Sequence, residues 1–184
     1  MRLDDKVAIV AGGARDIGKA VSERLAAAGA KVVVNYCNSV AGAEKTLAAI
    51  ESAGGTAIAV RGDMTRTDDV RRLVAETRKA FGDAIHVLVN VAGGLVARKS
   101  LAEMDEQFFE EVMRLNVTST FLTTQAVVPY MHAGSAIVNF SSLAGRDGGG
   151  PGAAAYATSK GAVMTFTRAM AKELGPANIR VNCV

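Results

Sequence analysis

The chain of 184 residues is long enough for one domain that buries roughly 70% of the surface of its unfolded form. Its 49% hydrophobic content, 5% aromatic content and 19 glycines favour an α/β protein with tight turns over a disordered or fibrous one. The net charge of +3 is small, and basic residues are interleaved with acidic ones, as in residues 68–72, whereas a nucleic-acid-binding protein more often carries a basic stripe.

The sequence also argues against a membrane protein, a secreted protein and a metal protein. No apolar run reaches the roughly 20 residues that span a bilayer, and residues 1–6 lack the apolar stretch of a secretory signal. Two cysteines, Cys37 and Cys183, are too few for a disulfide framework, and together with His86 and His132 they show no metal-ligand spacing. We therefore expect a cytoplasmic protein without a metal ion.

Apolar runs of strand length alternate with longer helical patterns along the whole chain. The predicted strands are 7–11, 31–36, 56–61, 85–90, 136–141 and 179–184, and the predicted helices lie near 17–28, 40–53, 67–81, 105–131 and 153–174, with Thr67 and Asp105 as N-caps. The strands are continuous Val, Ile and Ala runs, as expected for parallel strands covered on both faces. This alternation predicts one domain with a doubly wound parallel sheet, the Rossmann fold, in three α/β/α layers.

The first predicted strand runs directly into a glycine-rich turn, Ala11–Gly12–Gly13–Ala14–Arg15–Asp16–Ile17–Gly18, and a helix follows at once. Glycines let the backbone approach a pyrophosphate, and the N-terminus of the helix offers free N–H groups and the positive end of its dipole. Taken alone, such a turn is often purely structural. Its place at the first β–α connection of an alternating chain favours dinucleotide binding.

Tyr156 and Lys160 are four residues apart on the last predicted helix and therefore lie on one of its faces. An ammonium beside a phenol favours the phenolate, which suits proton exchange with the alkoxide that hydride transfer to a carbonyl leaves. The pair alone is common on protein surfaces. Ser142 follows the fifth predicted strand, at the sheet edge where ligands bind in this fold class. Asn116 is a polar residue inside an otherwise apolar helix, where it is mildly unfavourable.

Together these motifs resemble those of the short-chain dehydrogenase/reductase family over nearly the whole chain, most of all its 3-oxoacyl-carrier-protein reductase branch. The glycine turn matches TGxxxGxG with Ala11 in place of Thr and Asp16 in place of the middle Gly, and residues 90–93 match NNAG with Val91 in place of the second Asn. A carboxylate at position 16 repels a pyrophosphate unless it points away, in which case it favours the helix dipole.

The resemblance implies a role for each catalytic residue. Tyr156 is the general acid/base, and Ser142 polarises the substrate carbonyl, with Ser141 as the weaker candidate. Lys160 assists Tyr156 and binds the nicotinamide ribose, and Asn116 links Lys160 through water to solvent.

By the same resemblance, the cofactor-binding residues lie in the glycine turn and after the next three strands: Gly12, Arg15, Asp16, Ile17, Gly18, Tyr36, Asn38, Ser39, Asp63, Met64, Asn90, Ala92 and Gly93, with Tyr156 and Lys160. Asn90 is expected to stabilise the sheet. An NAD site carries an acid roughly 20 residues past the glycines, whereas residues 34–39 hold none. Arg15 is a basic residue suited to a 2′-phosphate, so NADP is favoured and NAD is the alternative.

We therefore expect an oxidoreductase that moves hydride between NADPH and a carbonyl or alcohol. A 3-oxoacyl thioester is one candidate substrate, and an NAD-dependent sugar or polyol dehydrogenase is an alternative. A non-catalytic dinucleotide-binding or assembly protein is the rival from another class, supported by Asp16 and Val91. Only the pI of about 9.0 supports a nucleic-acid-binding function.

The long predicted helices 105–131 and 153–174 carry more small and apolar residues than one core face needs, and they resemble those through which the family forms dimers of dimers. We expect a homotetramer, with a dimer as the alternative. The sequence stops within the sixth predicted strand, which would leave an unprotected sheet edge and an open substrate pocket. We therefore expect the natural protein to be longer than these 184 residues.

Overall fold

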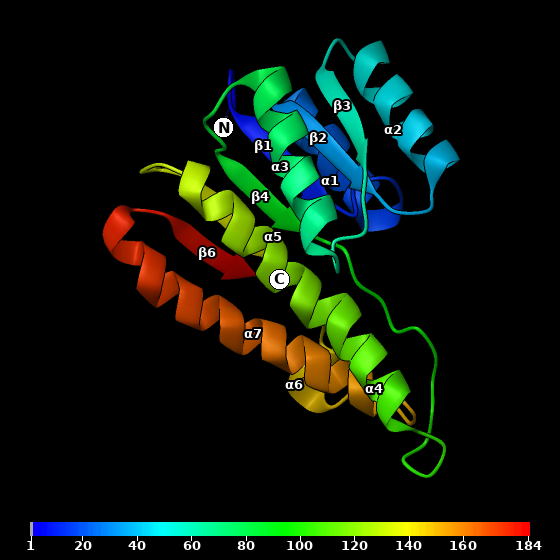
Figure 1. Ribbon diagram of the computed structural model, residues 1–184. Helices are drawn as coiled ribbons and strands as arrows, with labels where there is room; N and C mark the ends of the chain where they lie inside the picture. Colours follow the sequence, from blue (N-terminus) through cyan, green and yellow to red (C-terminus); the bar gives the residue numbers. More distant parts are fainter. Residues whose placement is uncertain (1) are drawn as a thin grey trace.

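The computed structural model describes residues 2–184 as a sheet of six parallel strands between two layers of helices (Figure 1). The strands are β1 (Val7–Ala11), β2 (Lys31–Tyr36), β3 (Thr56–Arg61), β4 (Val87–Asn90), β5 (Ala136–Asn139) and β6 (Arg180–Cys183), in the spatial order β3-β2-β1-β4-β5-β6. The doubly wound parallel sheet predicted from the sequence is confirmed. Its strand order reverses between β1 and β4, the point where such sheets bind ligands.

Helices connect the strands. They are α1 (Asp16–Ala27), α2 (Val40–Ser52), α3 (Thr67–Phe81), α4 (Glu106–Met113), α5 (Ser119–Val127), α6 (Ala144–Asp147) and α7 (Ala154–Leu174), with a π-helical segment η1 (Arg114–Thr118) and the short 3-10 segments η2 (Val128–Tyr130) and η3 (Gly175–Ala177). α4 lies beside α7, and α6 packs against α7 (Figure 1). η1 directly continues α4 and also contacts α7. None of the helices described between residues 2 and 184 is both long and apolar enough to cross a membrane.

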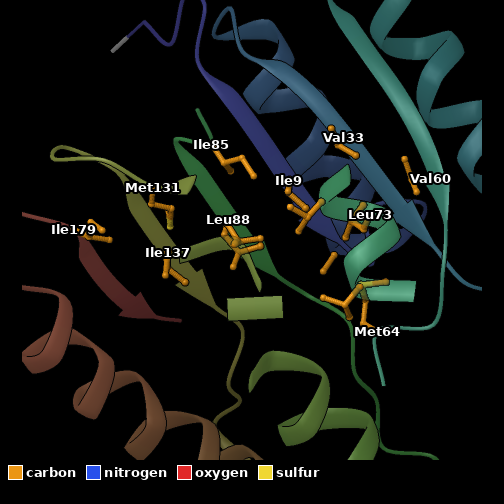
Figure 2. Packing of buried hydrophobic residues seen from close by; sticks show 14 of the residues in the cluster. Ile9, Val33, Val60, Met64, Leu73, Ile85, Leu88, Met131, Ile137 and Ile179 are labelled. Atoms are coloured by element: carbon orange, nitrogen blue, oxygen red, sulfur yellow. The ribbon is translucent and has the colours of Figure 1, made fainter. Parts of the chain in front are cut away.

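Each of the strands β1 to β5 contributes to two cores, because successive side chains point to opposite faces of the sheet. Ile9 and Val33 belong to the core covered by α3, α5 and α7 (Figure 2), whereas Val10 and Val34 belong to the core under α1 and α2. All four side chains are 0% exposed. Burial on both faces explains why the strands are continuous apolar runs in the sequence.

The predicted helix 105–131 is interrupted. It begins as expected after Asp105, whose carboxylate accepts a hydrogen bond from Phe108 N at 2.7 Å. The regular α-helix then gives way to η1 and ends in η2, where Pro129 has no N–H to donate. π-Helical turns are rare and occur frequently at functional sites.

The remaining differences from the predicted elements lie at their ends. The last three strands are one or two residues shorter than predicted at one or both ends. β4 begins after Ile85 because Ile85 N donates to Tyr130 O, which lies outside the sheet. Thr67 is the first residue of α3 rather than its cap, which is Arg66. Such boundaries are the least certain part of any sequence-based prediction, since helix and strand ends fray.

Candidate active site

The carboxyl ends of the strands bring the predicted site residues to one edge of the sheet. Ala11 is in register with Asn90, and Asn90 is in register with Asn139. The connections that follow β1, β4 and β5 therefore leave the sheet side by side. Ala92 N donates to Ala11 O at 2.8 Å, which joins the first two connections directly.

Two glycines of the first connection are required by close packing. Gly12 has a φ of +82°, and a Cβ there would lie 2.8 Å from Ala92 N. A Cβ on Gly18 would collide with Gly12 O, so α1 begins tightly against the turn. The first N–H groups of a helix have no partner inside it, and a helix start reached through a glycine turn is a common phosphate-binding arrangement.

Asn35 on β2 holds this turn in place, a role that the sequence analysis did not assign. Its Oδ1 accepts from Gly12 N at 3.2 Å, and its Nδ2 donates to Val60 O at 3.3 Å and to Gly62 O at 3.0 Å. The side chain is 2% exposed. It therefore ties the glycine turn to the end of β3, just before Asp63. The sequence signal for it was a polar residue within an otherwise apolar strand.

Arg15 and Asp16 lie exposed at the start of α1. Asp16 has a φ of 49°, a left-handed conformation that glycine adopts freely and that Asp tolerates better than most residues. Arg15 Nε lies 3.7 Å from Asp16 Oδ2, and the two side chains are 78% and 83% exposed. The carboxylate of Asp16 therefore lies in solvent beside the guanidinium, and an exposed pair of this kind contributes little to stability.

The predicted cofactor residues after β2 and β3 differ in what they can offer a ligand. Asp63 Oδ1 accepts hydrogen bonds from Thr65 N at 2.9 Å and from Thr65 Oγ1 at 2.8 Å. The Met64 side chain is 3% exposed and packs in the core, so only its backbone is available. Tyr36 is half-buried at the end of β2, Asn38 is exposed, and Ser39 directly precedes α2.

Asn90 has its side chain inside the protein. Its Oδ1 accepts from Thr123 Oγ1 at 2.6 Å, and its Nδ2 donates to Thr124 Oγ1 at 3.3 Å and to Asn139 Oδ1 at 2.9 Å. These bonds link β4, β5 and α5, and they engage every polar atom of the side chain. The Asn90 side chain therefore stabilises the sheet, as expected, and has no polar atom free for a ligand.

Asn116 lies in the π-helical segment and is 0% exposed. Its Nδ2 donates to Gly94 O at 2.9 Å and to Val112 O at 3.0 Å, while its Oδ1 accepts from Gly94 N at 3.0 Å. A Cβ on Gly93 would lie 2.5 Å from Asn116 Oδ1 and 3.2 Å from Lys160 Nζ. The absence of a side chain at Gly93 therefore lets the connection after β4 lie against both polar groups.

Lys160 is 5% exposed, and its Nζ donates to Phe140 O at 2.7 Å. The same Nζ lies 5.8 Å from the centroid of the Tyr156 ring. Burial lowers the pKa of Lys160 to about 8, and the bond to a carbonyl, which favours the charged form, opposes that effect. Tyr156 is half-buried and packs against a small apolar cluster that includes Phe108. The predicted pair on α7 is therefore a buried cation next to a partly accessible phenol.

The two serines after β5 have different partners. Ser141 Oγ donates to Lys160 O at 2.9 Å, which commits its hydroxyl to the backbone of α7. Ser142 Oγ accepts from Ala144 N at 3.2 Å, and within residues 2–184 its own hydrogen has no acceptor. The Ser142 hydroxyl can therefore donate to a ligand, whereas that of Ser141 is already engaged.

Two cavities of the described part of the chain lie away from this edge. One of about 360 Å³ lies between α1 and α2, and one of about 310 Å³ lies between α3 and α5. None of the predicted site residues lines either of them. No cluster of three or more His, Cys, Asp or Glu side chains within residues 2–184 is arranged to hold a metal ion.

Comparison with known sequences identifies related proteins. The sequence model of the short chain dehydrogenase family matches residues 6–184. The 3-oxoacyl-[acyl-carrier-protein] reductase of Synechocystis sp. is 41% identical, over 99% of this chain and 73% of its own length. A probable tetrahydroxynaphthalene reductase of Zymoseptoria tritici is 38% identical, over 100% of this chain and 68% of its own.

Solved structures of the same kind superpose closely. A short chain dehydrogenase from Burkholderia cenocepacia in complex with NADP is 35% identical with a TM-score of 0.94, over 100% of this chain and 74% of that one. The NADH-dependent reductase A1-R' in complex with NAD is 34% identical with a TM-score of 0.93, over 98% of this chain and 77% of that one. Both dinucleotides are therefore bound by structures similar to this chain.

Proposed function

The chain belongs to the short-chain dehydrogenase family and is an oxidoreductase, and on that premise we propose that it is a reductase that moves hydride between NADPH and a carbonyl compound. The described residues, 2–184, form one dinucleotide-binding and catalytic domain in this proposal.

The main support for this function is that two buried polar side chains lie beside the same glycine and close to a tyrosine ring. Asn116 Oδ1 and Lys160 Nζ both lie within contact distance of the position that a Cβ on Gly93 would take, and Lys160 Nζ lies 5.8 Å from the Tyr156 ring. A lysine that is 5% exposed is rare unless it is paired or functional, and here the carbonyl of Phe140 is its hydrogen-bond acceptor.

Four residues have separate roles in the reaction of a carbonyl substrate. A bound nicotinamide supplies or accepts the hydride. The Tyr156 hydroxyl gives a proton to the substrate oxygen as charge develops there, and the Lys160 ammonium stabilises the phenolate that remains. The Ser142 hydroxyl donates a hydrogen bond to the same oxygen. Asn116 acts on the position of Gly94 through its two hydrogen bonds.

The glycine turn fits a dinucleotide. The missing side chains of Gly12 and Gly18 leave the turn in direct contact with neighbouring backbone, and Asn35 fixes it from inside the sheet. NADP is favoured because Arg15 is exposed at the turn and residues 34–39 contain no acid that would repel a 2′-phosphate. Asp16, 3.7 Å from Arg15, reduces that preference, and NAD is the alternative.

The substrate proposal rests on two kinds of relative. The similarity to a 3-oxoacyl-[acyl-carrier-protein] reductase supports a 3-oxoacyl thioester, and the similarity to a tetrahydroxynaphthalene reductase supports an aromatic carbonyl compound. A sugar or polyol dehydrogenase is the third candidate. The alternative from another class is a dinucleotide-binding or assembly protein that catalyses no reaction.

We also propose a homotetramer in the cytoplasm. Phe109 and Phe121 are 37% and 42% exposed on α4 and α5, and Phe121 meets Phe166 of α7 edge to face at a centroid distance of 6.4 Å. Aromatic side chains left at the surface in this way suit burial by another copy of the chain. Cys37 and Cys183 are free thiols, which suits a reducing compartment.

The proposal is tested with purified protein, NADPH or NADH, and three carbonyl compounds: an acetoacetyl thioester, 1-tetralone and dihydroxyacetone. Binding of each dinucleotide is measured by fluorescence and turnover by loss of NADPH absorbance. We expect tighter binding of NADPH than of NADH and turnover of at least one carbonyl compound. Binding of NADPH without turnover of any of them favours the non-catalytic rival, and binding of neither dinucleotide contradicts both.

A further inference from the structure

The short segment that follows β5 is attached to α7 at three points. At its start, Phe140 O accepts the hydrogen bond from Lys160 Nζ at 2.7 Å. Ser141 Oγ donates to Lys160 O at 2.9 Å, so the backbone of the same lysine is bound as well. The third point is Gly145 on α6, where a Cβ would lie 2.8 Å from Lys160 C and 2.9 Å from Gly161 N. The segment therefore lies directly on the backbone of α7 at the buried lysine.

Ser142 belongs to this segment and is tied to its last point of attachment. Gly145 N donates to Ser142 O at 3.0 Å, and Ala144 N donates to Ser142 Oγ at 3.2 Å. A hydrogen bond between the first and fourth residues of a turn leaves little freedom between its ends. A shift of Gly145 away from α7 therefore also moves the Ser142 hydroxyl. Tyr156 does not share that shift, because it lies on α7, one turn before Lys160.

The contact between α6 and α7 depends on the absence of a side chain at Gly145. Gly145 and Gly161 both lie in helices and neither has a positive φ, so alanine fits the backbone conformation at both positions. A Cβ on Gly145 would meet two backbone atoms at 2.8 and 2.9 Å, and backbone atoms cannot rotate away. A Cβ on Gly161 would meet Gly145 O at 3.4 Å, an ordinary contact. Of the two positions, only 145 therefore requires glycine for close packing.

We propose that Gly145 and Ser141 are positioning residues for the reaction. By holding the segment after β5 on the backbone of α7, they set the separation between the Ser142 hydroxyl and the Tyr156 phenol. The inference rests on the proposed reductase function and extends it to two residues that act through their neighbours. Both hydroxyls must meet the same substrate oxygen, one with a proton and the other with a hydrogen bond. Misplacing a reacting group by about 1 Å can lower a rate by about 10²-fold.

Gly145→Ala and Gly161→Ala are a matched pair at one contact. Gly145→Ala should push the segment away from α7 and lower kcat about 10- to 100-fold, while the Kd for NADPH changes by less than about twofold. Gly161→Ala should leave kcat within about twofold of the wild-type value. It should also raise the Tm by about 1–4 °C, because alanine is favoured over glycine inside a helix.

Ser141→Ala is the milder variant, because it removes only the hydroxyl bonded to Lys160 O and introduces no clash. It should lower kcat about 3- to 10-fold, which corresponds to the loss of about one hydrogen bond. Ser135→Ala is the matched control. Ser135 is buried directly before β5, and its Oγ donates to the backbone carbonyl of Ile85 at 3.4 Å. This control should change kcat by less than about twofold.

A double-mutant cycle shows whether Gly145 acts through Ser142. If it does, Gly145→Ala should lower kcat by less than about twofold in a Ser142→Ala background, because the hydroxyl that it displaces is absent there. A general structural defect would lower the turnover of Ser142→Ala by the same factor as that of wild-type protein.

Crystal structures of wild-type protein and of the two glycine variants measure the separation without turnover. A Cβ at position 145 must move from 2.8 Å to about 3.4 Å or more from Lys160 C. The distance from Ser142 Oγ to Tyr156 Oη should therefore change by at least about 0.5 Å in Gly145→Ala and by less than about 0.2 Å in Gly161→Ala.

The inference is overturned if Gly145→Ala leaves this distance unchanged, or if its effect on kcat is as large in the Ser142→Ala background as in wild-type protein. If Gly145→Ala does not fold, Ser141→Ala decides, and a kcat equal to that of Ser135→Ala overturns the inference. Wild-type protein that turns over no carbonyl compound contradicts the proposed function, and the crystal structures then still show whether Gly145 sets the separation.

Discussion

Replacing Lys160 by methionine is expected to make the protein more stable and to lower its turnover strongly. Lys160 is 5% exposed, and burial lowers its pKa from 10.5 to about 8. A lysine whose pKa is lower in the folded protein than in the unfolded chain opposes folding at every pH at which both states hold the proton, which here means below about pH 8. Methionine has a similar length and no charge to remove from water.

The size of the effect follows from the pKa and from one hydrogen bond. At about 1.4 kcal/mol for each pH unit, lowering the pKa from 10.5 to about 8 costs about 3 kcal/mol of folding free energy at neutral pH. The variant loses the bond from Nζ to Phe140 O, which contributes about 1.5–3 kcal/mol because its donor is charged. The balance is a gain of up to about 1.5 kcal/mol, or a Tm higher by up to about 3–6 °C for a chain of this size.

The pH dependence of the stability gain shows whether the gain comes from removing a buried charge. Between about pH 8 and pH 10.5 the unfolded chain holds the lysine proton while the folded protein has released it, so the folding of wild-type protein becomes more favourable as the pH rises through this window. The advantage of Lys160→Met should therefore be largest below about pH 8 and shrink toward pH 10.5. Urea unfolding followed by circular dichroism at about pH 7 and about pH 9.5 measures it.

Lys172→Met, at an exposed position on the same helix, is the control and should change the free energy of unfolding by less than about 0.5 kcal/mol at either pH. Turnover of the Lys160 variant should fall at least about 10²-fold, since the ammonium no longer stabilises the tyrosinate. A variant that is less stable than wild-type protein at neutral pH, or whose advantage is the same at both pH values, refutes the reasoning.

Three further outcomes are expected. Tyr156→Phe should lower kcat at least about 10²-fold with little change in NADPH affinity, and near-normal turnover would show that another group is the acid. Arg15→Ala should weaken NADPH binding by about 1.5–3 kcal/mol and leave NADH almost unchanged, whereas equal losses would place the guanidinium on the shared pyrophosphate. Static light scattering at micromolar concentration should give the mass of a tetramer, or of a dimer as the alternative, and a monomer mass rejects assembly through α4, α5 and α7.

The sheet was predictable because its strands are buried on both faces. Continuous runs such as 7–11 and 31–36 leave few other structures that satisfy the backbone and bury so many β-branched side chains, and both match the observed strands residue for residue. The helix over 105–131 was predicted only in outline. Its π-helical segment contains Asn116, which bonds to Gly94 in a distant part of the sequence, and the local periodicity predicts neither the segment nor the bond.

The candidate site was predictable as a set of residues, but its energetics were not. The spacing of Tyr156 and Lys160 indicated a shared helix face, which the structure retains on α7. That the lysine is nearly inaccessible follows from the packing of α7 beside Phe140, which only the tertiary structure shows. The left-handed backbone of Val96, with a φ of 64°, was equally hidden, because valine has a strong preference against positive φ and nothing nearby in the sequence overrides it.

The local exceptions in this chain share a location. A buried lysine, an asparagine in a π-helical turn and a valine with positive φ each break a rule that holds elsewhere in the structure, and all three belong to α7, η1 or the connection after β4. Asp5 and Asn178, the left-handed residues away from this edge, are ordinary turn residues and break no such rule. Natural sequences tend to depart from local preferences where function requires it. Asp16 fits the same view, because its left-handed backbone keeps the turn intact: Gly12 N and Gly13 N both still bond to Asn35. Asp16 therefore places a negative charge beside Arg15 in a turn whose two glycine amides are bonded to Asn35.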